Sequence, residues 1–244
     1  HRASIFIKKN KSFLKMKLVE DIEILDLCLY LRKEKILVIG DMHIGLEESL
    51  QKQGFFIPRF DIEEVIKRLK NIFAEVEVKR IILIGDVKHE FGTISDQEWR
   101  DTLKVLDFLL EKGEVILIKG NHDTILGPIS KKRNIEVVEK YRVGEVLFVH
   151  GNKIIDDDAK IIVIGHEHPA VSFESRSDEK FKCFLVGKFK SKKLIVMPSF
   201  NFLTEGSDVT KEKSLSPYIK NIKNFKVYVV EDRVRDFGFV KDLK

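Results

Sequence analysis

The stretch ILVIGDMH at residues 36–43 joins a short apolar run to a glycine, an aspartate and a histidine. Four later stretches have the same design, an Ile- and Val-rich run that ends in Gly, Asp, Asn or His: IILIGD at 81–86, VILIKGNHD at 115–123, VLFVHG at 146–151 and IIVIGHEH at 161–168. Short apolar runs closed by glycine or polar residues are typical of buried β-strands. Because open α/β sheets build their sites at the carboxyl ends of strands, the five stretches predict one shared site there.

Length and composition are those of one globular α/β domain. The chain has 244 residues, 43% hydrophobic and 34% charged, which excludes a disordered chain. The formal net charge of +5 is compatible with an acidic or nucleic-acid partner, but it is spread over many lysines and indicates no particular surface. Cys28 and Cys183 stand far apart in strand-like contexts, which favours two buried reduced thiols.

No apolar stretch approaches the roughly 20 residues that span a bilayer. No secretory signal pattern is present, so we expect no membrane association and a cytoplasmic location.

The order of elements predicts a domain over residues 18–244, after an irregular or added N-terminal segment over 1–17. Up to Glu139, predicted strands and helices alternate as β-α-β-α-β-α-β; after it, strand-like runs dominate. We therefore expect a first sheet of βαβ units and a second sheet built mostly of strands, stacked with helices outside. The expected later strands cover 145–150, 161–165, 181–187, 193–197 and 225–230.

Two amphipathic helices are predicted together with their caps. Within a mostly helical region at 46–74, one helix begins at an Asp61 cap. The other runs from Ser95 to Glu111, with Ser95 and Glu98 as a capping box. A strand is expected at 22–29, a short helix after Asp123, and a long polar surface connection at 201–224.

Five of the seven histidines lie in the five stretches. In an extended segment, residues i and i+2 face the same way, so Asp41 and His43 can converge on one cation. His166 and His168 repeat this arrangement with two imidazoles. The full set of seven candidate ligands adds Asp86, Asn121 and His150. That number is too large for one ordinary site but suits two metals that share a carboxylate.

The donor types narrow the choice of metal. Carboxylate, imidazole and amide groups without a thiolate suit Mn²⁺, which we favour, with Ni²⁺, Zn²⁺, Fe and Co²⁺ as alternatives. Two divalent cations bring four positive charges, which Asp41 and Asp86 offset only in part. The centre would therefore remain positive and prefer an anion such as a phosphoryl group.

The ordered pattern Asp-x-His, Gly-Asp, Gly-Asn-His-Asp, His-Gly, Gly-His-x-His over residues 40–168 resembles that of the calcineurin-like metallophosphoesterase superfamily. Residues 85–92 also resemble small archaeal phosphoesterases related to the SbcD nuclease, and the ligase-associated phosphoesterases. The resemblance implies a four-layer αββα sandwich of two mixed sheets flanked by helices, with a dinuclear metal centre.

The same resemblance assigns roles to individual residues. It implies one metal on Asp41, His43, Asp86 and His168, and another on Asp86, Asn121, His150 and His166, with Asp86 bridging. His122 would give a proton to the leaving oxygen, and Asp123 would orient His122 through a ring N–H. A hydroxide bridging the metals would attack phosphorus in line.

Each motif residue also has an ordinary structural interpretation. Asp86 and Asn121 after glycines are typical of turns, and His150 could be a hydrogen-bonded core imidazole. The five stretches in order make that interpretation improbable when they are taken together.

His89 either contacts the scissile phosphate or a flanking nucleotide, or caps the next helix. Glu167 should point away from the metals. The lysines Lys188, Lys190, Lys192 and Lys193 suit a solvated hairpin better than a nucleic-acid contact, and Ser199 and Asn201 are candidates for the edge of the site.

Three alternative functions remain open for these residues. The first is a metal-dependent phosphodiesterase or nuclease that acts on DNA, RNA or a nucleotide. The second is a phosphomonoesterase or cyclic-nucleotide hydrolase, which would use the same metals. The third, from a different class, is a non-catalytic metal-bound scaffold; the presence of all seven candidate ligands together with His122 and Asp123 disfavours it.

Overall fold

Two β-sheets form the body of the protein. The structure, a computed structural model, describes residues 15–56, 62–90, 94–123, 127–173 and 176–243. The first sheet has seven strands that follow one another in space as they do along the chain. They are β1 (Lys15–Val19), β2 (Ile22–Leu25), β3 (Cys28–Leu31), β4 (Ile36–Ile39), β5 (Arg80–Ile84), β6 (Glu114–Ile118) and β7 (Glu136–Val138).

The second sheet has nine strands in the order β14-β11-β12-β13-β10-β9-β8, with β15 beside β12 and β16 beside β15. Both sheets mix parallel and antiparallel pairs, as expected. The bounds of these strands are β8 (Tyr141–Val143), β9 (Val146–Val149), β10 (Ile161–Ile164), β11 (Pro169–Phe173), β12 (Arg176–Phe189), β13 (Lys192–Val196), β14 (Ser207–Asp208), β15 (Lys226–Val230) and β16 (Val234–Phe239).

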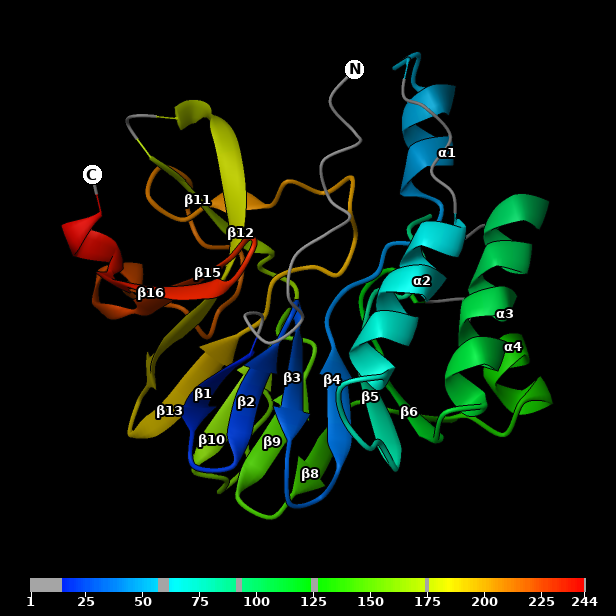
Figure 1. The fold of residues 1–244 in the computed structure, drawn as a ribbon, viewed down its shortest axis with the longest axis horizontal. Coiled ribbons are helices and arrows are strands. Elements are labelled where there is room, and N and C mark those ends of the chain that lie inside the picture. The colour runs from blue at the N-terminus through cyan, green and yellow to red at the C-terminus, as the bar shows by residue number, and fades with distance from the viewer. Residues whose placement is uncertain (1–14, 57–61, 91–93, 124–126, 174–175, 244) are drawn as a thin grey trace.

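The α-helices gather beside β4, β5 and β6 (Figure 1). They are α1 (Leu46–Lys52), α2 (Ile62–Phe73), α3 (Asp96–Leu110) and α4 (Gly127–Lys132). The predicted region 46–74 thus contains two helices, and its expected cap Asp61 lies outside the described residues. The cap of α3 is Ser95, whose hydroxyl accepts a hydrogen bond from the Glu98 N–H at 3.0 Å. None of the described helices combines the length and the apolar character needed to cross a membrane.

The central strands β9 and β10 of the second sheet are buried on both faces. In β10, Ile161 and Val163 join the main hydrophobic core, whereas Ile162 and Ile164 face a second cluster that includes Tyr218. The residues of that cluster outside the strands come mainly from the connection after β14, where Tyr218 is fully buried, and from the 3₁₀ turn η3 (Val240–Asp242). The two-sheet sandwich is therefore confirmed. In the described residues its outer layer on this side is formed by the connection and short 3₁₀ turns, so the expectation of a purely surface connection was wrong.

The N-terminal part differs from prediction in two details. Strand β1 begins at Lys15, so Lys15–Lys17 are not part of an irregular segment. The strand expected at 22–29 is two strands, β2 and β3, joined by a tight turn in which Asp26 has a φ of 57°. Cys28 and Cys183 are both buried and free, as predicted.

The carboxyl ends of the parallel strands meet at one edge of the sandwich. Strands β4, β5 and β6 are parallel, as are β9, β10 and β13. At this edge the segments that follow β4 and β13, one from each sheet, are in direct contact: the Phe200 N–H donates to the Asp41 carbonyl at 2.8 Å. A Cβ on Gly165 would lie only 2.4 Å from the Asp41 Oδ2 atom, so glycine is required for this approach. The fold thus brings the ends of the five motif stretches to one place.

Candidate metal centre

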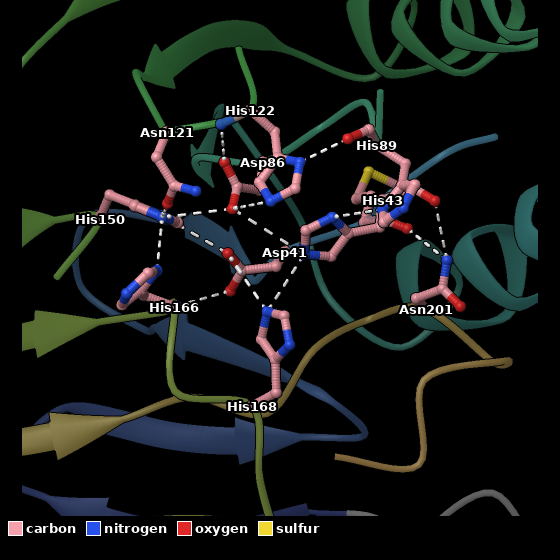
Figure 2. A network of polar contacts seen from close by, with 12 residues as sticks. Asp41, His43, Asp86, His89, Asn121, His122, His150, His166, His168 and Asn201 are labelled. Carbon is pink, nitrogen blue, oxygen red and sulfur yellow. Dashed lines mark hydrogen bonds and ion pairs between the residues drawn. The ribbon is translucent and has the colours of Figure 1, made fainter. Parts of the chain in front are cut away.

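All seven candidate ligands converge at that edge (Figure 2). Each follows a parallel strand or lies in the loop just after it, and Asp41, His43, Asp86 and His150 are buried. Three sets of His and Asp side chains have ligand atoms within 4.8 Å of one another: Asp41 with His43 and His168, Asp86 with His150 and His166, and His43 with His89 and His122. Each of the first two sets contains three of the four residues that the family resemblance assigns to one metal.

The ligand side chains converge, but the expectation that the two motifs are extended, with residues i and i+2 facing the same way, was wrong. His43 has a φ of 43°, His166 of 64° and His168 of 46°, so neither Asp-x-His nor His-x-His is extended. Asp86 also has a left-handed backbone, with a φ of 42°. Such conformations are costly for residues other than glycine and cluster at functional sites. Sharp local turns, held by the surrounding structure, aim these side chains inward.

The first group surrounds a buried oxygen. The Oδ1 atom of Asp41 has no hydrogen-bond partner among the described residues. It lies 3.6 Å from His168 Nε2 and 3.4 Å from His150 Nδ1. His43 Nε2 and His168 Nε2 are 3.3 Å apart, so the two rings point at one spot. A buried acceptor without a partner beside converging ring nitrogens fits a cation.

The second group is oriented by the backbone. His150 Nδ1 lies 3.1 Å from the Ile84 carbonyl, and an N–H there leaves Nε2 free to bind a cation. Its Nε2 lies 3.3 Å from Asp86 Oδ2, 2.8 Å from Asn121 Oδ1 and 3.2 Å from His166 Nδ1. His150 Nε2 and these three groups thus make four donors that meet at one place.

Asp86 lies between the two groups. Its Oδ2 is 3.3 Å from His150 Nε2 on one side and 3.9 Å from His43 Nε2 on the other. Its Oδ1 accepts a hydrogen bond from the His122 N–H at 2.8 Å. This carboxylate can therefore face both positions that a cation would take.

The protein's own charges favour positive charge here. Burial disfavours the charged form of His150, but the hydrogen bond to Asp86 and the charge of Asp41 outweigh it and raise the pKa of His150 to about 9. Burial and the neighbouring His168 lower the pKa of His43 to about 3, and burial with His150 lowers the pKa of His166. Two carboxylates beside the imidazoles of His43 and His166, whose lowered pKa values favour the neutral form, are donors suited to divalent metals.

The expected role of Asp123 requires correction. Its Oδ1 accepts from the Val87 N–H and its Oδ2 from the Gly120 N–H, both at 3.0 Å. The ring Nδ1 of His122 instead faces the carbonyl oxygen of His89. Asp123 therefore holds the loops after β5 and β6 together. The His89 carbonyl, and not the Asp123 side chain, is the group placed to orient the His122 ring.

His89 lies at the site. Its ring stacks on that of His122 with centroids 5.4 Å apart, and its Nδ1 is 3.4 Å from His43 Nδ1. Because Ser95 caps α3, the alternative in which His89 caps the next helix is wrong. Glu167 points away from the ligands, as expected, and accepts hydrogen bonds from the Leu215 and Ser216 N–H groups.

The segment after β13 supports the site, and the lysine hairpin does not reach it. Asn201 Nδ2 donates to the carbonyls of Met42 at 2.7 Å and His43 at 3.0 Å, which confirms Asn201 at the edge of the site. Ser199 is buried, and its hydroxyl accepts from Lys182 Nζ at 2.8 Å. Lys188–Lys193 lie at the β12–β13 turn, at the opposite end of the parallel strands from His166.

Two residues near the site were not identified as site residues from the sequence. Lys182, within β12, holds the 199–201 segment, and burial lowers its pKa to about 7. Glu98 is fully buried and binds the backbone of the loop that carries His89. A charged residue on the otherwise apolar face of a predicted helix was the available clue to Glu98.

Replacing Gly120 with alanine is expected to disrupt the centre. The new Cβ would lie 2.1 Å from Asp86 Oδ1 and 2.3 Å from the Asp86 nitrogen, so Asp86 must move. We expect a loss of about 1–3 kcal/mol in the free energy of unfolding and weaker metal binding, measured by thermal unfolding and calorimetry. Gly127→Ala, whose Cβ meets nothing within 4 Å, is the matched control. Equal metal binding by the two variants would contradict the expected displacement.

Comparisons with known proteins find a matching family model and similar solved structures. Residues 34–229 match the family model described as calcineurin-like phosphoesterase. Among solved structures, the chain is similar to the nuclease MPE of Pseudomonas putida, with 21% identity and a TM-score of 0.69 over 93% of this chain and 100% of that one. It also matches YfcE, a phosphoesterase from E. coli, with 12% identity and a TM-score of 0.36 over 80% of this chain and 87% of that one. No curated protein sequence matches the chain.

Proposed function

This chain belongs to the calcineurin-like phosphoesterase family, and we propose that it hydrolyses phosphodiesters, with a nucleic acid or nucleotide as substrate, at a centre of two divalent cations. The observation that carries the proposal is the position of Asp86. Its carboxylate lies between two groups of converging donors, and His122 stands beside it, with His122 Nε2 3.9 Å from Asp86 Oδ2.

The proposed ligands fall into two groups that share Asp86. Asp41, His43 and His168 hold one cation, and Asn121, His150 and His166 hold the other. When bound, two such cations bind phosphoryl oxygens, lower the pKa of water and stabilise the charge that develops in the transition state. Mn²⁺ is the metal we favour, and a cytoplasmic location stays a prediction of the sequence.

His122 is the proposed general acid. With its Nδ1–H directed at the His89 carbonyl, its Nε2 is the nitrogen that can carry a proton to the leaving oxygen. The ring also lies next to both donor groups, 4.9 Å from the His43 ring centroid. Asp123 supports this arrangement indirectly, by holding the two loops that present Asp86 and His122.

A cavity beside the centre favours a diester over a monoester. It has a volume of about 350 Å³, and one of its lining residues is Asn201, whose amide holds the backbone of His43. Its wall combines apolar and aromatic side chains with three cations and two carboxylates: Leu27, Phe181, Phe202, Val230, Arg68, Lys180, Lys182, Glu179 and Glu231. Aromatic faces and cations are what single-stranded nucleotides contact on proteins. A monoester would leave this cavity unused.

Hydrolysis of bis-p-nitrophenyl phosphate and of p-nitrophenyl phosphate in Mn²⁺ tests the proposal. We expect faster hydrolysis of the diester, lost on addition of EDTA and restored by excess metal. A preference for the monoester would favour the phosphomonoesterase alternative. Binding of metal without hydrolysis of any ester in Mn²⁺, Ni²⁺, Zn²⁺ or Co²⁺ would favour the non-catalytic scaffold.

Replacing Phe202 with alanine is expected to affect nucleotide substrates selectively. The ring is 38% exposed, and the Arg68 guanidinium lies 4.9 Å from its centroid. If a base stacks here, the KM for a dinucleotide should rise about 10-fold, since stacking on an aromatic ring contributes about 1–3 kcal/mol. Methyl p-nitrophenyl phosphate, which has no base, serves as the control substrate. An equal change for both substrates would argue against a nucleoside in this cavity.

A further inference from the structure

Glu98 is a buried carboxylate that none of the proposed steps uses. It lies in the first turn of α3, three residues after the Ser95 cap, and its exposed fraction is 0%. In a capping box its side chain would turn back to the Ser95 N–H. Instead, its Oε1 accepts from the N–H groups of His89 at 2.8 Å and Glu90 at 3.0 Å. A carboxylate is costly to bury, so the position of Glu98 requires an explanation.

The explanation lies in the peptide unit that joins His89 to Glu90. This unit contains the Glu90 N–H, which Glu98 binds, and the His89 carbonyl, which faces His122 Nδ1. Because a peptide unit is planar, fixing the direction of its N–H also fixes the direction of its carbonyl. Glu98 therefore sets the orientation of the acceptor that selects the tautomer of His122.

The space for Glu98 is built into the start of α1. Gly45 has a φ of 92°, and a Cβ at that position would lie 2.8 Å from the Glu98 Cγ and 3.0 Å from its Cδ. The Ile44 carbonyl beside it also accepts from the His89 N–H at 2.9 Å. The loop after β5 is thus held from two sides, by the segment that carries His43 and by α3.

We propose that Glu98 is a positioning residue for proton donation: through the 89–90 peptide it keeps the His122 Nδ1–H on the His89 carbonyl, so that in the imidazolium form the second proton, on Nε2, points at the leaving oxygen and passes to it. This inference rests on the proposed function of His122. It concerns a residue of α3 that is neither one of the candidate ligands nor part of the cavity lining.

The test compares leaving groups that differ in their need for a proton. A p-nitrophenolate leaves without much help from an acid, whereas the alkoxide released from a dinucleotide needs protonation. We expect Glu98→Ala to lower kcat for the dinucleotide about 10-fold to 100-fold, and to change kcat for methyl p-nitrophenyl phosphate less than about 3-fold. Glu98→Gln, which keeps an oxygen acceptor in place, should restore the kcat for the dinucleotide.

Thr102→Val is the matched control on the same helix. Thr102 is fully buried one turn after Glu98, and its Oγ1 has no hydrogen-bond partner among the described residues. This variant perturbs the same helix without touching the 89–90 peptide, so both esters should be hydrolysed as by the wild type. If Glu98→Ala does not fold, Glu98→Asp, which is one methylene shorter, should give the same selective loss.

A second readout is independent of activity. The ¹⁵N spectrum of the histidine rings should show His122 as the Nδ1–H tautomer in the wild type and in Glu98→Gln, and as a mixture of tautomers in Glu98→Ala. An equal loss on both esters, or no loss with an unchanged tautomer, overturns the positioning role. A wild-type protein that hydrolyses neither ester overturns the proposed function itself, and this inference with it.

Discussion

Asp86→Asn is expected to bind two metal ions far more weakly and to lose activity by a factor on the order of 10²–10³ in kcat/KM. Asparagine tolerates the left-handed backbone at this position and can still accept the His122 N–H, so the fold should survive. What is lost is the negative charge between the two donor groups. Charge stabilisation of several kcal/mol corresponds to this loss of rate. Isothermal titration with Mn²⁺ and steady-state kinetics measure the two effects.

Asp26→Asn is the matched control for that change. Asp26 is also buried, also has a left-handed backbone, with a φ of 57°, and pairs with Arg68 away from the candidate ligands. This variant should still bind two ions. If Asp86→Asn binds two ions with the affinity of the wild type, the carboxylate of Asp86 does not bridge them.

His122→Ala is expected to lower kcat for a dinucleotide by about 10²–10⁴ while metal binding stays intact. The backbone N–H of His122 donates to Asp86 Oδ1, and alanine retains this hydrogen bond. The ring Nε2 lies 3.9 Å from Asp86 Oδ2, outside the two donor groups of the proposed centre. The loss should be much smaller for esters of p-nitrophenol. Kinetics on both substrates and the number of bound ions should be measured on the same preparation.

His166→Ala gives the contrasting result. It removes a proposed ligand, so metal binding and the hydrolysis of both kinds of ester should fall together. If His122→Ala also loses metal, the residue is a ligand and the assignment as general acid is wrong. If it keeps full activity on the dinucleotide, another group donates the proton.

The sequence alone predicted the strands that lead into the site, and the positions of the candidate ligands at their ends, because both depend on local pattern. An Ile- and Val-rich run followed by glycine and a polar residue identifies a buried strand and its carboxyl end, as β4 and β10 show. Parallel pairing then brings these ends together without further information. The capping interaction of Ser95 with the Glu98 N–H is equally local and was also predictable.

Features set by tertiary contacts could not be predicted in this way. The left-handed turns at His43 and His168 depend on the chain around them, since no glycine marks either position. The oxygens of Asp123 bind two loops of the folded protein, and its neighbour in sequence, His122, turns instead to a carbonyl 33 residues away. The capping pattern correctly placed Glu98 in the first turn of α3 but could not show that its carboxylate serves the loop of His89.

Anomalous X-ray diffraction from crystals grown with Mn²⁺ can locate the metal ions. We expect two anomalous peaks about 3.5–4 Å apart, one beside His43 and His168, the other beside His150 and His166, with the Asp86 carboxylate between them. A single peak, or peaks that Asp86 does not touch, at saturating metal would contradict a two-metal centre built on a shared carboxylate.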